Sequence, residues 1–153
     1  MGFLKEWWTF LGYLFTRKID QDMVEAKMSH ILTKGYAAMM WCGVLISRPI
    51  YTVTRKTWNH EGIHLQQARK KGSWPKFYLS YLGEYLWNLL FLWLGFSGAY
   101  YCISYEMQAY GNESDYKYTV TDENMKLYKI KNKRKVWKEN KKTWKTYCRS
   151  IEK

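Results

Sequence analysis

The sequence predicts an α+β fold that is mostly helical, with a short strand pair ahead of a central helix. Three observations carry this prediction: helical spacing of apolar residues near both chain ends, residues of strand-forming type between 36 and 54, and an HEGIH pentapeptide at residues 60–64. With 153 residues the chain can bury a substantial core. We therefore expect a single domain over residues 1–153.

The first element is an amphipathic helix expected over residues 1–18. Leu4, Leu11 and Phe15 belong to an apolar series at helical spacing, and basic residues follow it. A helix of this kind can dock on a core or lie in a membrane interface. The polar segment 20–28 comes next, and we expect it to be helix or loop.

The apolar segment 36–54 contains the predicted strands. Val44, Ile46, Ile50 and Val53 favour extended structure, whereas Pro49 interrupts the run. These residues predict two short strands or one bent edge strand. A strand pair at this point in the chain would form the wall of a cleft beside the next helix.

The HEGIH pentapeptide is expected on a helix that covers residues 58–68. Thr57 is a suitable N-cap, the basic residues 69–71 suit a helix C-terminus, and Gly72 suits the position after it. Residues four apart on a helix share one face, so His60 and His64 can bind one zinc ion. Glu61 between them can act on a water molecule that the metal activates.

Gln67 lies three residues after His64, near the same face of the predicted helix. Its amide can donate a hydrogen bond to a ligand of the metal, or it can simply face a hydrated cleft. His30 is the only other histidine of the chain, and we expect it to be structural.

Two helices are expected over 76–94 and 99–112, separated near the glycines at 95 and 98. The uncharged run 85–104 is about as long as a bilayer-spanning helix, so burial by protein and burial by lipid are both open. A final amphipathic helix, basic on its outer face, is expected over 126–153.

Charge and cysteine usage limit the possible surroundings of the protein. The segment 117–153 has 13 basic and 4 acidic residues and carries most of the net charge of +12. Such a tail can contact anionic lipid, but no nucleic-acid-binding motif accompanies it. The three cysteines show no disulfide framework and no cleavable signal peptide is evident, which favours a cytoplasmic or membrane-associated protein.

A catalytic zinc site commonly has three protein ligands, so a third is needed. Glu84 lies 20 positions after His64 and has Asn88 one turn further on, whereas Glu106 lies 42 positions after His64. Glu113 is two turns beyond Glu106, on the same face of a helix. Spacing alone leaves Glu84 and Glu106 as alternatives.

The segments NHEGIHLQQ at 59–67 and YEMQAYGNE at 105–113 resemble gluzincin-type zinc metallopeptidases, and in particular small bacterial zincin-like proteins. The resemblance covers roughly residues 35–145. It implies a zincin-like fold with Glu106 as third ligand. Tyr110 replaces the aspartate that the better-known pattern has, and Glu113 or Asp115 could take over that carboxylate's role. Glu84 instead matches the shorter thermolysin-like spacing.

Together these features predict a zinc-dependent hydrolase that cleaves peptide or protein substrates. His60, His64 and Glu106 would bind Zn²⁺, and Glu61 would take a proton from water and pass it to the leaving amine. Tyr110 could stabilise the oxyanion, although packing is the more ordinary role for such a ring. The alternative is a non-enzymatic, membrane-associated protein with a structural or vestigial metal site.

Overall fold

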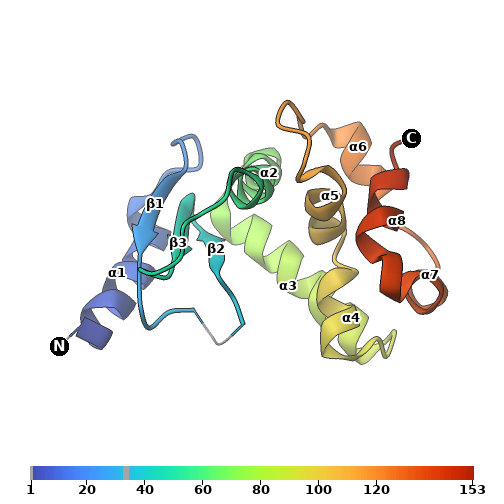
Figure 1. Ribbon diagram of the computed structural model, residues 1–153, viewed down its shortest axis with the longest axis horizontal. Coiled ribbons are helices and arrows are strands. Elements are labelled where there is room, and N and C mark those ends of the chain that lie inside the picture. Colours follow the sequence, from blue (N-terminus) through green and yellow to red (C-terminus); the bar gives the residue numbers. More distant parts are fainter. Residues whose placement is uncertain (1, 33–34) are drawn as a thin grey trace.

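The computed structural model describes residues 2–32 and 35–153, and Figure 1 shows a small sheet between the N-terminal helix at one end and the other helices. The described elements are α1 (Gly2–Thr16), β1 (Val24–Lys27), β2 (Ala38–Trp41), β3 (Val44–Ser47), α2 (Arg55–Lys71), α3 (Trp74–Leu90), α4 (Gly95–Tyr101), α5 (Ser104–Asn112), α6 (Asp122–Leu127), α7 (Lys133–Asn140), a 3₁₀ turn (Lys141–Thr143) and α8 (Trp144–Ser150). The predicted mostly helical α+β architecture is confirmed at this level.

The sheet has the strand order β1-β3-β2, with β1 parallel and β2 antiparallel to β3. The predicted strand pair is confirmed as β2 and β3, and both strands end before Pro49, so residues 50–53 are not strand as their composition suggested. The prediction of helix or loop for 20–28 is wrong because β1 forms there. Its four residues are mostly exposed and show no apolar alternation, and only pairing with β3 makes them a strand.

Helix α1 agrees with the predicted N-terminal helix to within two residues at its C-terminal end. Its inner side packs on the sheet, where the ring of Phe10 stacks on Trp41 of β2 with centroids 4.8 Å apart. Trp7 and Tyr13 contact the same cluster, which includes Val44 of β3. The opposite side of α1 faces solvent.

Helix α2 begins one turn earlier than predicted, because Thr54 rather than Thr57 is its N-cap. The Thr54 hydroxyl oxygen accepts a hydrogen bond from the backbone N–H of Thr57 at 3.1 Å. The predicted C-terminus is confirmed: Gly72 adopts a left-handed conformation with φ of 81° and donates its N–H to Ala68 and Arg69. Ser73 then caps α3.

The two helices predicted over 76–94 and 99–112 are three, because the chain breaks at residues 91–94 and again at 102–103. Gly98 lies inside α4 instead of in the break. A Cβ there would lie 2.7 Å from Nε1 of Trp137, so the close approach of α7 requires glycine. Within residues 2–32 and 35–153, no helix is both long enough and apolar enough to cross a bilayer.

The prediction of a single helix over 126–153 is wrong, because this region contains the end of α6, then α7, a 3₁₀ turn and α8. Thr121 and Asn124 form a capping box that starts α6, and the 3₁₀ turn redirects the chain between α7 and α8. This bend brings Trp137 and Trp144 into an edge-to-face contact at 5.0 Å. All three cysteines are buried and unpaired, as the sequence suggested.

Candidate metal centre

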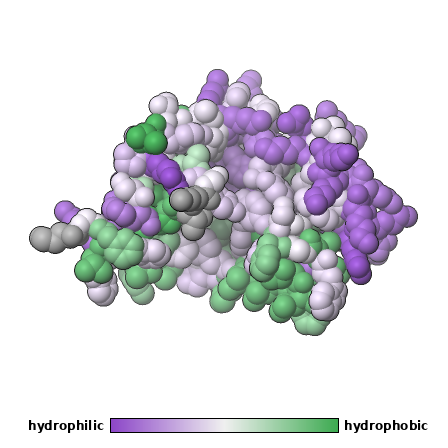
Figure 2. Space-filling view, turned by 60° about the horizontal axis from the view of Figure 1, so that its bottom comes forward, coloured by the Kyte–Doolittle hydropathy of each residue, from purple (hydrophilic) through white to green (hydrophobic). Residues whose placement is uncertain are grey.

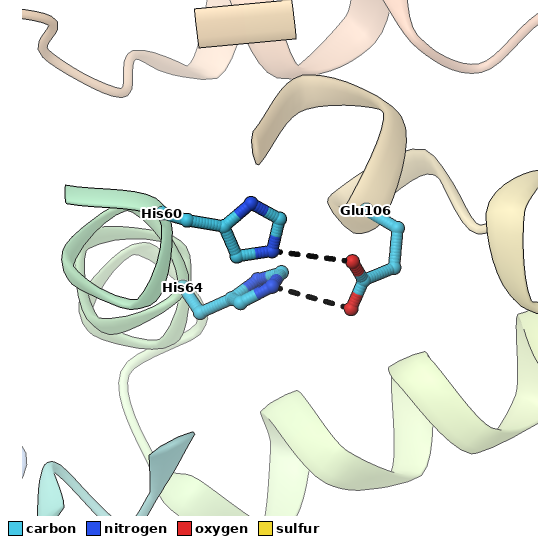
Figure 3. Close-up of side chains that lie close together, drawn as sticks. All are labelled: His60, His64 and Glu106. Carbon is cyan, nitrogen blue, oxygen red and sulfur yellow. Dashed lines mark ion pairs between the residues drawn. The ribbon is translucent and has the colours of Figure 1, made fainter. Parts of the chain in front are cut away.

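Three predicted ligands meet between helices α2 and α5. Figure 3 shows His60 and His64 projecting from α2 toward the carboxylate of Glu106 on α5. Nε2 of His60 lies 3.4 Å from Oε2 of Glu106, and Nε2 of His64 lies 3.2 Å from Oε1. One ligand atom from each residue lies within 4.8 Å of the others, and all three residues are buried. This spacing and donor set can hold one metal ion.

The other nitrogen of each imidazole faces an acceptor. Nδ1 of His60 lies 3.2 Å from Oε2 of Glu113, and Nδ1 of His64 lies 2.8 Å from Oε1 of Gln67. An acceptor at Nδ1 favours the proton on that nitrogen and leaves the Nε2 lone pair toward Glu106. Both imidazoles therefore have the orientation that a metal ligand needs, and their neutral forms would present Nε2 to the metal.

Gln67 is fully buried and acts on His64 as an acceptor, not as the donor that the sequence suggested. Its Nε2 donates to the carbonyl of Tyr105 and to Oε1 of Gln108, at 3.0 and 2.9 Å. These two bonds fix the amide so that its oxygen faces His64. The hydrated-cleft alternative for Gln67 is wrong because its side chain is completely enclosed.

The sequence left Glu113 and Asp115 as alternatives for the supporting carboxylate, and it is Glu113 that contacts His60. Lys56 and Lys145 lie 3.0 and 3.5 Å from its Oε1, while Oε2 faces His60. Asp115 instead accepts a hydrogen bond from the backbone of Lys117. The carboxylate that holds His60 is thus flanked by two cations.

Glu106 is held from a second side by Tyr81 of α3, whose hydroxyl donates to Oε1 at 2.7 Å. Oε2 is buried and has no hydrogen-bond partner among the described residues. A buried carboxylate oxygen without a donor is costly unless a cation neutralises it. Nε2 of His60, 3.4 Å away, has no proton for this oxygen when His60 is neutral, so a metal ion between the two atoms fits the site.

Glu61, the predicted proton acceptor, lies on α2 beside the edge strand β2. Its Oε2 accepts a hydrogen bond from the backbone N–H of Met40 at 3.0 Å. Burial raises the pKa of Glu61, although the two histidines act in the opposite direction. The carboxylate is therefore a stronger base than an ordinary surface glutamate.

Glu84, the rival third ligand, lies outside the cluster. It accepts hydrogen bonds from the backbone N–H and hydroxyl of Ser104, and Lys133 lies 3.4 Å away. It therefore caps the start of α5 and ties that helix to α3. Asn88 donates to the carbonyl of Ala99 and serves the same packing.

The remaining histidine and tyrosine predictions are resolved by contacts. His30 pairs with Glu6 of α1 at 3.2 Å, in agreement with a structural role. The ring of Tyr110 lies edge-on against His60, with centroids 4.6 Å apart. Tyr110 therefore packs on a candidate ligand, which agrees with the packing alternative.

Sequence reasoning missed three residues of the site. Asn59 donates to the backbone carbonyls of Asn112, Glu113 and Asp115 and so fixes the segment that carries Glu113. Tyr81 positions Glu106, and Tyr100 lines the cavities on both sides of Glu61. Asn59 adjoins the HEGIH motif, but nothing in the sequence singled out these two tyrosines from fourteen.

Two cavities meet at the cluster. One has a volume of about 380 Å³ and a largely apolar lining that includes Leu32, Met39 and Phe77. The other is a wider cleft of about 1000 Å³ that reaches past His60 to Lys56 and Lys145. Glu61, Tyr81 and Tyr100 line both, so the site is reached from both cavities.

Without metal, the cluster is a set of buried ion pairs. Burial acts to lower the pKa of His60, but its contacts with Glu106 and Glu113 outweigh burial and raise the pKa to about 10. The pKa of His64 is also raised, against the effect of burial, by the charge of Glu106. Conversely, the histidines outweigh burial and hold the pKa of Glu106 far below its usual range.

The metal-free protein should lose stability as the pH rises from 6.5 to 9. The histidines have pKa values near 6.5 when unfolded and higher when folded, so their stabilising effect is complete below pH 6.5 and decreases as the pH rises; for His60 it disappears on approach to pH 10. The slope is at most about 1.4 kcal/mol per pH unit for each histidine. Thermal unfolding in chelator measures it.

A His30→Gln variant is the matched control for this slope, because His30 lies outside the cluster and pairs with Glu6. It should retain the pH dependence of the wild type. A metal-free wild type whose melting temperature is flat between pH 6.5 and 9 would contradict the ion-pair description.

The chain matches no protein-family model, no curated protein and no solved structure. The resemblance to gluzincin peptidases therefore stays a hypothesis, and the assignment of the site depends on its own geometry.

Proposed function

We propose that the protein is a zinc-dependent hydrolase that cleaves peptide bonds. The observation that carries this proposal is the convergence of His60, His64 and Glu106 in a buried cluster. Glu61 directly follows His60 in the sequence and lines a cavity beside the cluster. Each of the two imidazoles also has an acceptor at Nδ1. A chance meeting of polar residues does not explain this complete set.

Two neutral imidazole nitrogens and one carboxylate form a donor set that zinc uses in hydrolases. His60, His64 and Glu106 would hold the ion, and Tyr81 would keep the carboxylate of Glu106 in place. A bound zinc ion supplies Lewis-acid polarisation of a substrate carbonyl and of water. The orphaned Oε2 of Glu106 supports occupancy by a cation.

Glu61 would carry the proton during hydrolysis. The water oxygen bonds to the carbonyl carbon, the C–N bond breaks, and the carboxylate of Glu61 moves the proton from water to the amine nitrogen. Its raised pKa favours proton acceptance, and the hydrogen bond from Met40 fixes its orientation. Glu61 also lines both cavities, so it can reach a substrate in either one.

The edge strand β2 offers a place for an extended peptide. Met40 directs its N–H away from β3 toward Glu61, and the alternation of a strand directs the backbone groups of Ala38 to the same edge. A substrate strand that pairs there would run past Glu61. The apolar cavity of about 380 Å³ beside it has room for one large apolar side chain.

Tyr100 is our candidate for stabilising the oxyanion. It lies at the junction of the two cavities, and burial together with the charge of Glu106 raises the pKa of its hydroxyl. The hydroxyl therefore remains a hydrogen-bond donor throughout the neutral pH range. Tyr110 is less suited to this role because its ring packs on His60.

The zinc-loaded protein should cleave members of a mixed peptide library, with a large apolar residue on one side of the cleaved bond. The apolar cavity next to Glu61 is the physical reason for this preference. Mass spectrometry of the products identifies the bond, and the same protein in excess chelator is the control. A protein with stoichiometric zinc that cleaves no peptide would refute the proposal.

The second candidate is a non-enzymatic protein in which the metal stabilises the packing of α2 on α5. The large apolar side chains exposed on α1 and α3 favour it, because exposed apolar patches mark sites of attachment to proteins or membranes. In that case zinc raises the melting temperature, but Glu61→Gln changes no measurable reaction.

A further inference from the structure

The connection from α3 to α4 exposes a group of large apolar side chains. We call it the apolar tip; its members are Trp87, Leu90, Phe91, Trp93 and Phe96. Trp93 and Phe96 are each 76% exposed, and the rings of Trp87 and Phe91 stack on one another at 4.5 Å. Glu84 is the only charged residue between positions 77 and 97, and it is half-buried. Burial in water-free surroundings would stabilise this tip.

The backbone at the tip is strained in a way that internal packing does not explain. Trp93 has φ of 52°, in the left-handed region that a bulky side chain avoids. Its ring faces solvent, so no contact with the core offsets the strain. Strained backbone positions cluster at functional sites, so Trp93 is a candidate for one.

A basic rim borders the apolar tip. Lys129, Lys131 and Lys133 line a shallow cavity together with Trp87 and Leu92, and the adjoining cavity is lined by Arg134, Lys135 and Lys138. Figure 2 shows the green area over the ends of α3 and α4 next to the purple surface of the C-terminal helices. Apolar and cationic groups are thus side by side.

Helix α1 adds a second apolar area. Leu4, Trp8, Leu11 and Phe15 form an exposed stripe at helical spacing, and Lys5 lies beside it. The acidic residue of this helix, Glu6, is turned toward His30 and the backbone of residues 29–30. In Figure 2 this area appears on the same face of the molecule as the apolar tip.

We propose that the apolar tip and its basic rim dock on an anionic membrane surface, with α1 as a second contact. Tryptophan and phenylalanine favour the boundary between headgroups and acyl chains, and lysines beside them bind the phosphates of anionic lipids. The tip would enter the interface without crossing the bilayer. This docking does not depend on the proposed hydrolase activity.

Charge favours a membrane over a second copy of the chain. In a two-fold contact centred on the tip, each tip would meet a tip, and the tip of a second copy has no acidic residue to pair with the basic rim. The acidic residues beside the rim are already engaged, Glu84 by Ser104 and Lys133 and Glu139 by Lys135. Such a dimer would leave the basic rim without an anionic partner, whereas an anionic lipid surface complements it.

Co-sedimentation with vesicles tests the proposal on the full-length protein. Vesicles of phosphatidylcholine mixed with phosphatidylglycerol should bind the wild type, and vesicles of phosphatidylcholine alone should bind it much more weakly. The double variant W93S/F96S should partition about tenfold less, because two largely exposed rings are removed from the interface. I50S is the matched control, since Ile50 is 95% exposed and lies outside the tip.

Lysine variants separate the electrostatic contribution to vesicle binding from the apolar one. K129Q/K131Q retains the apolar tip and should lose about tenfold in binding to the anionic vesicles, with little change on neutral ones. The membrane assignment is overturned if W93S/F96S binds like the wild type, or if lipid composition has no effect. It is also overturned if the wild type binds neither kind of vesicle and light scattering shows a dimer that W93S/F96S abolishes.

Discussion

Replacing Glu61 with glutamine is expected to lower the turnover number for peptide hydrolysis by about a hundred- to ten-thousandfold, while zinc content stays unchanged. Glutamine has nearly the same shape, and its amide oxygen can still accept the hydrogen bond from Met40. It cannot take a proton from water at neutral pH. The variant therefore removes the base and leaves the cluster of His60, His64 and Glu106 intact.

The comparison needs three measurements on one preparation: turnover of a cleaved peptide, zinc content and melting temperature. Glu139→Gln is a suitable control because Glu139 is an exposed glutamate on α7, paired with Lys135, and it should behave like the wild type. Normal turnover by Glu61→Gln would remove Glu61 from the mechanism. Loss of zinc would instead mean that the carboxylate supports metal binding.

The parts of the site that local sequence signals determine were predicted well. His60, Glu61 and His64 belong to one helix, and the left-handed Gly72 ends that helix where expected. Such signals act within a few residues, so a single sequence contains them. The mistaken N-cap at Thr57 shows the limit, because Thr54 is an equally suitable residue one turn earlier.

Long-range contacts account for what the sequence did not predict. Strand β1 exists because β3 pairs with it, and its own residues carry no strand pattern. Helices α7 and α8 are separate because Trp137 and Trp144 pack together across the 3₁₀ turn between them. Gln67 became an acceptor only because Tyr105 and Gln108 occupy its amide nitrogen.

The choice between Glu84 and Glu106 also depends on long-range contacts, since spacing in the sequence does not determine which carboxylate approaches the histidines. We expect Glu106→Gln to weaken zinc binding by more than about a hundredfold, beyond the effect typical of residues that only support a ligand. Glu84→Gln should retain zinc. Zinc content after dialysis, together with a competition titration against a chelator, measures both.

The two variants should also differ in stability without metal. Glu84→Gln weakens the cap of α5 and the pairing with Lys133, and should cost about 1–2 kcal/mol at any pH near neutrality. Glu106→Gln removes the charge that raises the pKa of His64 and contributes to that of His60. The melting temperature of Glu106→Gln should therefore fall much less between pH 6.5 and 9 than that of the wild type.

This crossed pattern identifies the third ligand by two independent readouts. A ligand that also neutralises the histidines must change both the zinc affinity and the pH slope, as expected for Glu106. A residue that only caps a helix lowers the stability and changes neither. If Glu84→Gln lost zinc while Glu106→Gln retained it, the cluster between α2 and α5 would be a structural ion-pair network, because its carboxylate would have no metal to bind.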